Sequence, residues 1–289
     1  IERLKAQHEL GRVTRVGATC APNSVSASTL AAIAAPDHRI EEVAEIIGSE
    51  PGVNHSYLRE DDWNLWFVAT GPDRAHVDAT LAMIEKRSGL KVLDLRLVRP
   101  FNVDLGFQMK QPGAAVIPAT PVDLSARKPG DREILQSLTE GLPLTERPYL
   151  ELGEKLDRSE GDVMERISTL QDAGIIARLG VIVRHRALGW RSNAMVVWDL
   201  SSEQIDKAGP LLAAQEGVTL CYERRPIDGV WPYRLYSMFH ARSRSAALDA
   251  LSKAADLPEL RGVRHKALFS TRCFKQTGAL IKPRPMEAA

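Results

Sequence analysis

Two neighbouring segments in the second half of the chain carry side chains that could bind an acid and move a proton. Residues 217–240 read GVTLCYERRPIDGVWPYRLYSMFH, which predicts two strands joined by a loop rich in proline, glycine and tryptophan. Since successive side chains point to opposite faces of a strand, Tyr222 and Arg224 share one face, and Met238 and His240 share one face of the neighbouring strand. A tyrosine, an arginine and a histidine can therefore meet on one sheet surface, beside the loop tryptophan.

Imidazole and guanidinium groups suit different parts of such chemistry. A histidine titrates near neutral pH and can donate or accept a proton, whereas the guanidinium fork binds carboxylates. Other interpretations stay open from the sequence. The histidines could be ordinary hydrogen-bonded residues, and Arg59 and Arg224 could form ion pairs with Glu60 and Glu223. Cys221 has no evident adjacent base, so we interpret it as a small buried apolar residue rather than a nucleophile.

The chain contains an internal repeat. Residues 2–17 (ERLKAQHELGRVTRVG) align without a gap on residues 165–180 (ERISTLQDAGIIARLG). Residues 52–59 (GVNHSYLR) align on residues 217–224 (GVTLCYER). The sequence is therefore a duplication of one unit.

The two copies differ in their histidines. In the alignment, His55 lies opposite Leu220 and His240 lies opposite Thr70, so neither copy carries both. Two arrangements follow: each half holds its own site with one histidine, or one site at the interface between the halves uses both. We favour a dominant site in the second half, where the aromatic loop is present, with help from the first half.

Each copy predicts the same order of elements. In the second copy, three short segments have helical spacing, with Ser159 placed to cap the third and Gly174 to end it, which indicates a winged helix-turn-helix. A ferredoxin-like βαββαβ order follows. The helices are expected at 131–139, 145–155 and 159–173 and the wing at 175–183, followed by strand 193–200, helix 201–215, strands 218–224 and 233–240, helix 243–255 and strand 262–274.

The predicted fold is α+β, a tandem repeat of a winged helix-turn-helix and a ferredoxin-like domain with the first helix-turn-helix incomplete. Residues 104–130 are rich in proline and glycine and show little periodicity, which is typical of an extended linker. We expect the start of the first copy to be missing from the chain. The expected domains are a remnant of the first helix-turn-helix and wing at 1–17, a ferredoxin-like domain at 18–103, the linker at 104–130, a winged helix-turn-helix at 131–183 and a second ferredoxin-like domain at 184–282.

Composition excludes several classes of protein. The 289 residues include 38 Lys and Arg against 37 Asp and Glu, a net charge of +1, so the chain has no overall basic field for non-specific nucleic-acid binding. No run of 18 apolar residues could span a bilayer. Three widely separated cysteines fit reduced thiols in a cytoplasmic protein and lack the paired spacing of a zinc site. We therefore expect a cytoplasmic protein that is not associated with a membrane and holds no metal ion of its own.

The second helix-turn-helix is acidic where a DNA reader would be basic. Residues 156–178 hold three basic and five acidic side chains, which would repel phosphate. DNA binding is therefore not expected, and the module is interpreted as serving packing and dimerisation. A transcriptional regulator remains an alternative.

Two resemblances narrow the function. A winged helix-turn-helix followed by a ferredoxin-like domain resembles the leucine-responsive (Lrp/AsnC) regulators. The strings CYER, WPYRLYSMFH and ALFSTRCFK in the second copy, with VNHSYLRE and NLWFV in the first, resemble the fused form of the siroheme decarboxylases of the haem d1 and alternative haem routes. Arg234 and Ala241 depart from that pattern, which usually has Asn and Gly there.

This resemblance implies the loss of CO2 from two acetate side chains of siroheme, which leaves methyl groups and yields 12,18-didecarboxysiroheme. The tetrapyrrole is then the partner and its own electron sink, its iron belongs to the substrate, and no further cofactor is required. The fused halves would form an intrachain pseudo-dimer, which could associate further into a homodimer. A haem-binding protein without catalysis is a second alternative.

The resemblance also implies the site residues. The catalytic group is expected to comprise His55, Tyr57, Arg59, Tyr222, Arg224 and His240. Contacts to the carboxylates and the flat ring are expected from Arg184, His185, Met195, Arg225, Trp231, Tyr236, Met238 and Lys275.

Overall fold

The two halves of the chain fold alike. The computed structural model describes residues 1–22, 24–103 and 121–283. Each half contains the order βαββαβ, which confirms the predicted α+β class. The first half contains β2 (Ala27–Ile33), α2 (Ile40–Ser49), β3 (Val53–Arg59), β4 (Leu65–Gly71), α3 (Arg74–Ser88) and β5 (Val92–Leu95), and the second contains β8 (Ser192–Trp198), α7 (Ser202–Ala213), β9 (Val218–Arg224), β10 (Leu235–Ala241), α8 (Arg244–Ala255) and β11 (His265–Gln276).

All these strands, with β6 (Leu97–Val103), belong to one sheet in the order β5-β2-β4-β3-β11-β8-β10-β9-β6. The early residues of β11 pair with β8 of their own half, and from Ser270 onward the strand pairs with β3 of the other half. In the same way β5 pairs with β2, and β6, which follows after a single residue, pairs with β9. Each half therefore passes its last strand to the other, and the halves are joined at both sides.

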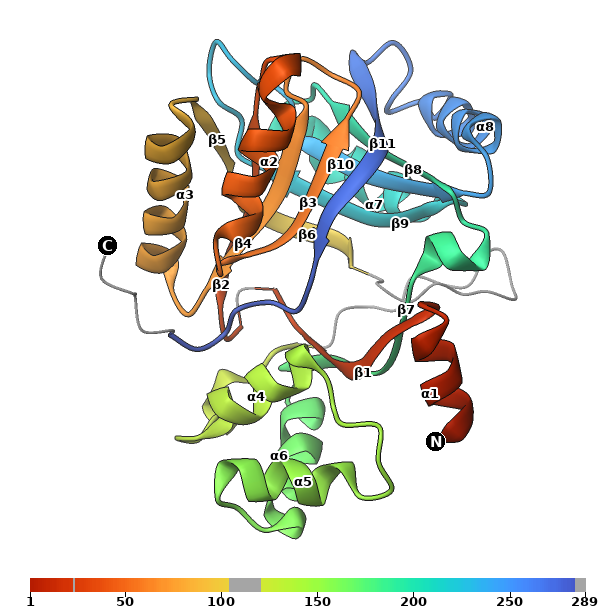
Figure 1. Ribbon diagram of the computed structural model, residues 1–289. Coiled ribbons are helices and arrows are strands. Elements are labelled where there is room, and N and C mark those ends of the chain that lie inside the picture. The colour runs from red at the N-terminus through yellow and green to blue at the C-terminus, as the bar shows by residue number, and fades with distance from the viewer. Residues whose placement is uncertain (23, 104–120, 284–289) are drawn as a thin grey trace.

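The sheet has an outer face under helices and an inner face between the halves. On the outer face, α2 and α3 cover the first half, and α7 and α8 cover the second (Figure 1). We call the inner face the side on which apolar residues of both halves form one cluster: Ala32, Trp66, Leu93, Leu95, Met195, Val197, Trp231, Tyr233, Tyr236 and Leu268. Alternation along each strand sends one set of side chains to each face.

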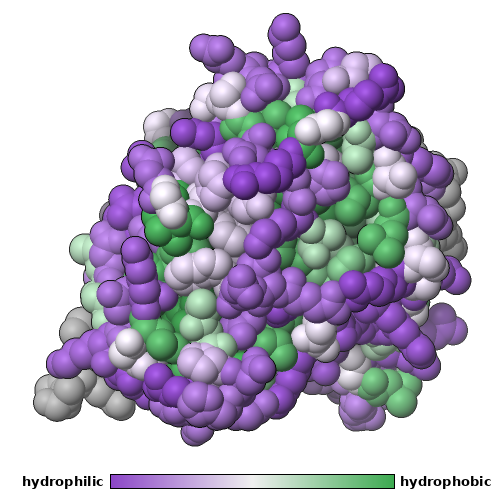
Figure 2. All heavy atoms as spheres, turned by 90° about the horizontal axis from the view of Figure 1, so that it is seen from above, coloured by the Kyte–Doolittle hydropathy of each residue, from purple (hydrophilic) through white to green (hydrophobic). Residues whose placement is uncertain are grey.

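Seen from above, hydrophilic residues cover most of the molecule and apolar ones form separate patches (Figure 2).

A helical module lies below the large sheet. It consists of η2 (Leu124–Ala126), α4 (Asp131–Glu140), α5 (Pro148–Leu156) and α6 (Glu160–Asp172), and the short η3 (His185–Leu188) leads on to the second half. Ser159 caps α6 by accepting a hydrogen bond from the amide of Asp162, as its position in the sequence predicted.

Two strands lie between this module and the large sheet (Figure 1). β1 (Val13–Cys20), which follows α1 (Glu2–Glu9), pairs antiparallel with β7 (Ile176–Val183). The repeat-equivalent residues Gly17 and Gly180 lie directly opposite each other in this pair. The two wings of the duplicated unit therefore pair around a local twofold.

The predicted domain limits stay predictions. The predicted linker lies largely outside the described residues, because residues 104–120 are not described. Among the described residues, no helix is both long enough and apolar enough to cross a membrane.

Candidate active site

The residues that the sequence predicts to be catalytic lie on strands that contribute to the inner face. Tyr57 pairs with Trp66 and Tyr222 pairs with Tyr236 across neighbouring strands, so both tyrosines share this face with its apolar cluster. His240 pairs with Asn193, two residues from Met195 of the cluster. The candidate site is therefore built from strands of both halves of the chain.

Arg59 crosses from the first half to the second. Its Nη1 donates to the carbonyl of Leu268 (3.0 Å) and to Oδ1 of Asn193 (3.4 Å), and its guanidinium carbon lies 5.6 Å from the centre of the Tyr57 ring. The side chain is only 6% exposed, and its Nε has no hydrogen-bond partner in the described part of the chain. Burial lowers the pKa of Arg59 to about 10, and the nearby Arg186 adds to this.

Arg224 is the counterpart of Arg59 in the second half. Its Nη1 donates to the carbonyl of Leu95 in the first half (2.9 Å), and its guanidinium carbon lies 5.3 Å from the ring centre of Tyr222 and 5.8 Å from that of Tyr236. Its Nε is buried and, among the described residues, also lacks a partner. Burial lowers the pKa of Arg224.

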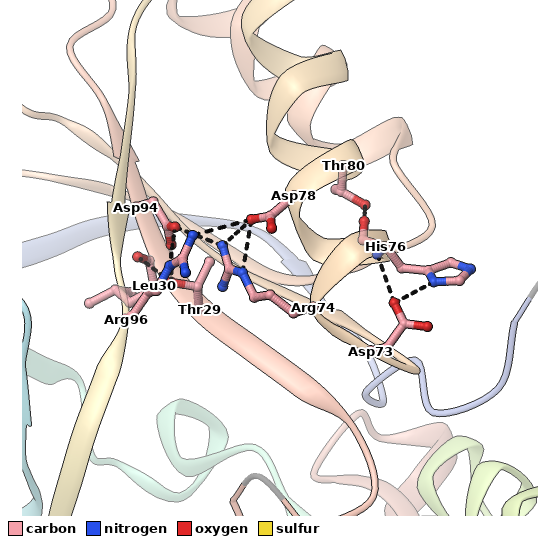
Figure 3. A network of polar contacts seen from close by, with 9 residues as sticks. All are labelled: Thr29, Leu30, Asp73, Arg74, His76, Asp78, Thr80, Asp94 and Arg96. Carbon is pink, nitrogen blue, oxygen red and sulfur yellow. Dashed lines mark hydrogen bonds and ion pairs between the residues drawn. The ribbon is translucent and has the colours of Figure 1, made fainter.

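The carboxylate near Arg224, that of Asp94, is already hydrogen-bonded to other side chains. Asp94 accepts hydrogen bonds from Nη2 of Arg74 (2.6 Å), Nε of Arg96 (2.7 Å) and the hydroxyl of Thr29 (2.6 Å), as Figure 3 shows. Its charge is therefore neutralised mainly by the two surface arginines.

Neither inner-face arginine forms the ion pair that the sequence left open. Glu60 accepts two hydrogen bonds of 2.7 Å from Arg244. Glu223 pairs instead with Arg99 (2.6 Å) and accepts a bond from Ser202. Glu223 points to the opposite face from Arg224 because neighbouring residues alternate along β9, and Glu60 lies just beyond the end of β3.

His240 is held at both ring nitrogens. Nδ1 lies 2.7 Å from Oγ1 of Thr219, and Nε2 lies 3.0 Å from Nδ2 of Asn193. The side chain is buried, at 8% exposure. Because Asn193 also contacts Arg59, one amide connects the histidine of the second half to the arginine of the first.

His55 lies further along β3 and differs in its protonation. Its ring stacks beside that of Tyr57 at 6.4 Å between centres. Burial lowers the pKa of His55 to about 4, and the positive charge of Arg15 contributes. At neutral pH the ring is uncharged. The tyrosine hydroxyls are protonated at neutral pH as well, and burial raises the pKa of both Tyr57 and Tyr222 further, to about 12.

Three further arginines surround this end of the inner face. Arg15 lies on β1 near His55. Arg184 directly precedes η3 and Arg186 is its second residue. Burial raises the pKa of the Cys273 thiol, and the positive charges of these two arginines act against this. Within the described residues, no carboxylate pairs with any of the three. Among the residues that the structure describes, this positive rim therefore has no carboxylate as a counter-charge.

The remaining predicted contacts have different surroundings. Trp231, Tyr236 and Met195 are buried in the inner-face cluster, where Nε1 of Trp231 donates to the hydroxyl of Tyr236 (2.8 Å), and Met238 is half-buried beside them. Lys275 donates to the carbonyls of Gly48 and Glu50 at the end of α2 (2.7 and 2.9 Å).

The other two predicted contacts are Arg225 and His185. Arg225 is exposed. The backbone of His185 begins η3, and its side chain lies outside what the structure describes. The roles of all these residues stay predictions.

Sequence reasoning did not select Asn193, Thr219, Arg15 or Arg186 for this site. The register offers a signal for Asn193, because it lies opposite His240. Cys221 behaves as predicted, since it is fully buried and burial raises the pKa of its thiol. The described residues contain no group of three or more His, Cys, Asp or Glu side chains that could hold a metal ion.

Comparison with known proteins places the chain in a family. Residues 25–102 and 187–275 match the AsnC-like ligand binding domain, and residues 131–176 match the siroheme decarboxylase NirDL-like HTH domain. The siroheme decarboxylase NirDL subunit of Paracoccus denitrificans is 53% identical over 281 residues, which cover 97% of this chain and 86% of that protein. The chain belongs to the siroheme decarboxylase family.

Other members of the siroheme decarboxylase family agree in sequence and structure. The siroheme decarboxylase of Hydrogenobacter thermophilus is 31% identical over 255 residues, or 86% of this chain and 75% of that protein. Crystal structures of a siroheme decarboxylase NirDL, alone and in co-complex with an iron-uroporphyrin III analogue, superpose with a TM-score of 0.68 at 26% identity. They cover 97% of this chain and 82% and 83% of those chains.

Proposed function

We propose that this chain decarboxylates two acetate side chains of siroheme to methyl groups, yielding 12,18-didecarboxysiroheme for haem d1 or haem biosynthesis. One observation carries the proposal: two arginines on the inner face, Arg59 and Arg224, have buried Nε–H groups that, among the described residues, meet no acceptor. A buried donor without an acceptor is costly, so such groups indicate an anionic ligand. A tetrapyrrole with several carboxylates supplies such acceptors.

The reacting acetate binds at Arg59. The guanidinium fork orients the carboxylate by charge-assisted hydrogen bonds while the methylene carbon faces the ring system of the substrate. When the bond between this carbon and the carboxyl carbon breaks, CO2 leaves and the electron pair stays on the carbon, delocalised into the tetrapyrrole. A proton then adds to the carbon, and no net oxidation or reduction occurs.

His240 supplies this proton. It is joined to Arg59 through Asn193. His55 lies beside Tyr57, and its lowered pKa of about 4 makes it a poor group to take up a proton near neutral pH, so it serves as a wall of the site. The site therefore uses His240 of the second half together with Arg59 of the first. The sequence favoured a dominant site in the second half with help from the first, and in this proposal the second half supplies the proton donor and the first half the arginine.

The other carboxylates of the substrate meet the positive rim. Arg15, Arg184 and Arg186 carry charges that no carboxylate of the described residues neutralises. Tyr57, Tyr222 and Met238, all half-buried, provide surface for the flat ring. Arg224 binds the second acetate or a neighbouring carboxylate of the substrate. The edge of the substrate is contacted by Arg225, His185 and Lys275.

The reaction needs no cofactor beyond the iron that the substrate carries. The two halves act as an intrachain pseudo-dimer, and a cytoplasmic location and a further homodimer stay predictions. The helical module does not read DNA, since Arg166 is buried against Asp131 and Arg158 is paired with Asp162. These ion pairs engage positive side chains that would otherwise be able to bind DNA phosphates.

Anaerobic incubation with siroheme tests the proposal. Mass spectrometry of the product is expected to show the loss of two molecules of CO2 with the wild-type protein and a loss of rate of about 100-fold or more with His240→Gln. His265→Gln serves as the matched control, because His265 is exposed on β11. A spectral change without CO2 release would indicate a haem-binding protein instead. If the protein instead shifted the electrophoretic mobility of a promoter DNA fragment in a salt-sensitive way, this would indicate a transcriptional regulator.

A further inference from the structure

Asn193 lies between the two groups on which the proposed reaction depends. Its Oδ1 accepts a hydrogen bond from Nη1 of Arg59 (3.4 Å), and its Nδ2 lies 3.0 Å from Nε2 of His240. The side chain is 6% exposed. Asn193 pairs with His240 and lies two residues from Met195 of the inner-face cluster, which places it on the inner face of β8. A single buried amide thus connects the carboxylate-binding arginine to the proton donor.

The chemistry of the partners determines which way this amide points. A guanidinium can only donate hydrogen bonds, so the oxygen of Asn193 faces Arg59. The amide nitrogen then faces His240 and can only donate, so Nε2 accepts and carries no proton. The orientation of the amide therefore sets the protonation of the ring.

The other ring nitrogen has a matching partner. In the neutral ring the proton resides on Nδ1, which donates to Oγ1 of Thr219 at 2.7 Å. The Thr219 hydroxyl donates in turn to the carbonyl of Met238 (3.3 Å). Each contact in this chain, from Nη1 of Arg59 to the carbonyl of Met238, therefore joins one donor to one acceptor.

We propose, resting on the function above, that Asn193 is a positioning residue that keeps His240 in the Nδ1–H form until a substrate carboxylate occupies Arg59. The carboxylate forms stronger, charge-assisted bonds to the guanidinium than the neutral amide does, so it releases Oδ1. The amide then turns and presents Oδ1 to Nε2. Nε2 takes up a proton from water, and the protonated ring delivers it to the methylene carbon as CO2 leaves.

This arrangement belongs to one half only. Ser28 pairs with Thr70 in the first half at the positions that Asn193 and His240 occupy in the second. Neither Ser28 nor Thr70 can form an amide-to-imidazole link. The repeat therefore provides Ser28→Ala as a matched control.

Nitrogen-15 NMR of the full-length protein with labelled histidine tests the protonation state directly. In the substrate-free protein, the signals absent from His240→Gln are expected to show the Nδ1–H form. In Asn193→Asp, which offers Nε2 only oxygens, the same signals should move to an Nε2-protonated form, and Ser28→Ala should leave them unchanged. A wild-type ring protonated at Nε2, or no change in Asn193→Asp, would overturn the proposal.

Single-turnover kinetics with siroheme test the coupling. Asn193→Ala is expected to slow CO2 release by about tenfold or more, with the siroheme Kd measured by absorbance changing less than about threefold. Thr219→Val is expected to slow release in the same way, and Thr219→Ser, which keeps the hydroxyl, to restore it. Weaker siroheme binding with an unchanged rate in Asn193→Ala would contradict the positioning role.

The outcomes separate this inference from the function itself. If the wild-type protein releases no CO2 from siroheme, the proposed function fails whatever the NMR result. If it releases CO2 and the His240 signals do not respond to Asn193→Asp, only the positioning role fails. Because Thr219 is half-buried near the start of its strand, its variants test the same network if the Asn193 variants fold poorly.

Discussion

Arg59 and Arg224 are repeat-equivalent residues that reach across to the opposite half in the same way. Arg59 donates to the carbonyl of Leu268 and Arg224 to the carbonyl of Leu95, and each guanidinium lies near the tyrosine two residues before it. Their further neighbours differ. Arg59 continues to Asn193, whereas Arg224 lies near Tyr236 of the inner-face cluster. An approximate twofold thus provides two similar arginines, and the residues around them assign different roles.

Replacing each arginine by lysine should separate these roles. Arg59→Lys loses the fork that binds a carboxylate at two points, and a lost charged hydrogen bond raises the siroheme KM by about 10- to 100-fold. Arg224→Lys should raise KM less. Steady-state decarboxylation under anaerobic conditions measures both. Equal effects of the two changes would contradict the assignment of the reacting acetate to Arg59.

The stability of the protein should depend on pH through His55. Its pKa is lowered from about 6.5 in the unfolded chain to about 4 in the folded state. The contribution of neutral His55 to the stability of the folded state is therefore complete above the pKa of the unfolded chain, and it is lost as the pH falls toward the pKa of the folded state. Between pH 7 and pH 5 we expect the wild type to lose about 2 kcal/mol more of its unfolding free energy than His55→Gln, which does not titrate. Urea unfolding at both pH values measures this, and equal losses would contradict it.

The paired wing glycines should differ sharply in their tolerance of a methyl group. A Cβ at Gly17 would lie 2.3 Å from the carbonyl oxygen of Leu138 in α4, whereas a Cβ at Gly180 would meet nothing within 4 Å. Gly17→Ala is therefore expected to cost about 1–3 kcal/mol of unfolding free energy. Gly180→Ala should change it by less than about 0.5 kcal/mol. Thermal unfolding of both variants checks the packing of the wings against the helical module.

The buried ion pair of the helical module should be essential for its stability. Asp131 and Arg166 are almost completely buried, with Oδ2 2.8 Å from Nη2. Asp131→Asn leaves the guanidinium uncompensated and is expected to cost about 3–5 kcal/mol. Glu60→Gln, which breaks the exposed pair with Arg244, should cost less than about 1 kcal/mol. Urea unfolding followed by circular dichroism compares the two.

Acid should act on the same pair. Burial alone would raise the pKa of Asp131, but the hydrogen bonds from Arg166 and from the amide of Lys128 outweigh it, and the pKa is lowered. The stabilisation is therefore present above the ordinary pKa of an aspartate and is lost as the pH falls through the lowered value. Asp131→Asn should remove this part of the acid sensitivity.

Local features of the fold could be predicted because their causes are local. The cap at Ser159 depends on one side chain and the amide of Asp162 three residues later, and the alternation in residues 218–224 is visible in the letters alone. The pairing partners could not be predicted in this way. The pattern of β11 is the same whether it pairs with β8 or with β3, and here it pairs with both. Pairing between distant segments depends on the whole fold.

By itself, the sequence determined the repeat, the order of elements and the fact that His55 and His240 belong to different copies. Only the tertiary structure decided that Arg59 of one half reaches His240 of the other through Asn193, since the last strands cross between the halves. It also decided that His55 is uncharged at neutral pH, because burial and the charge of Arg15 come from neighbours in space. Residue types define which groups can act, and their surroundings define their charge and their partners.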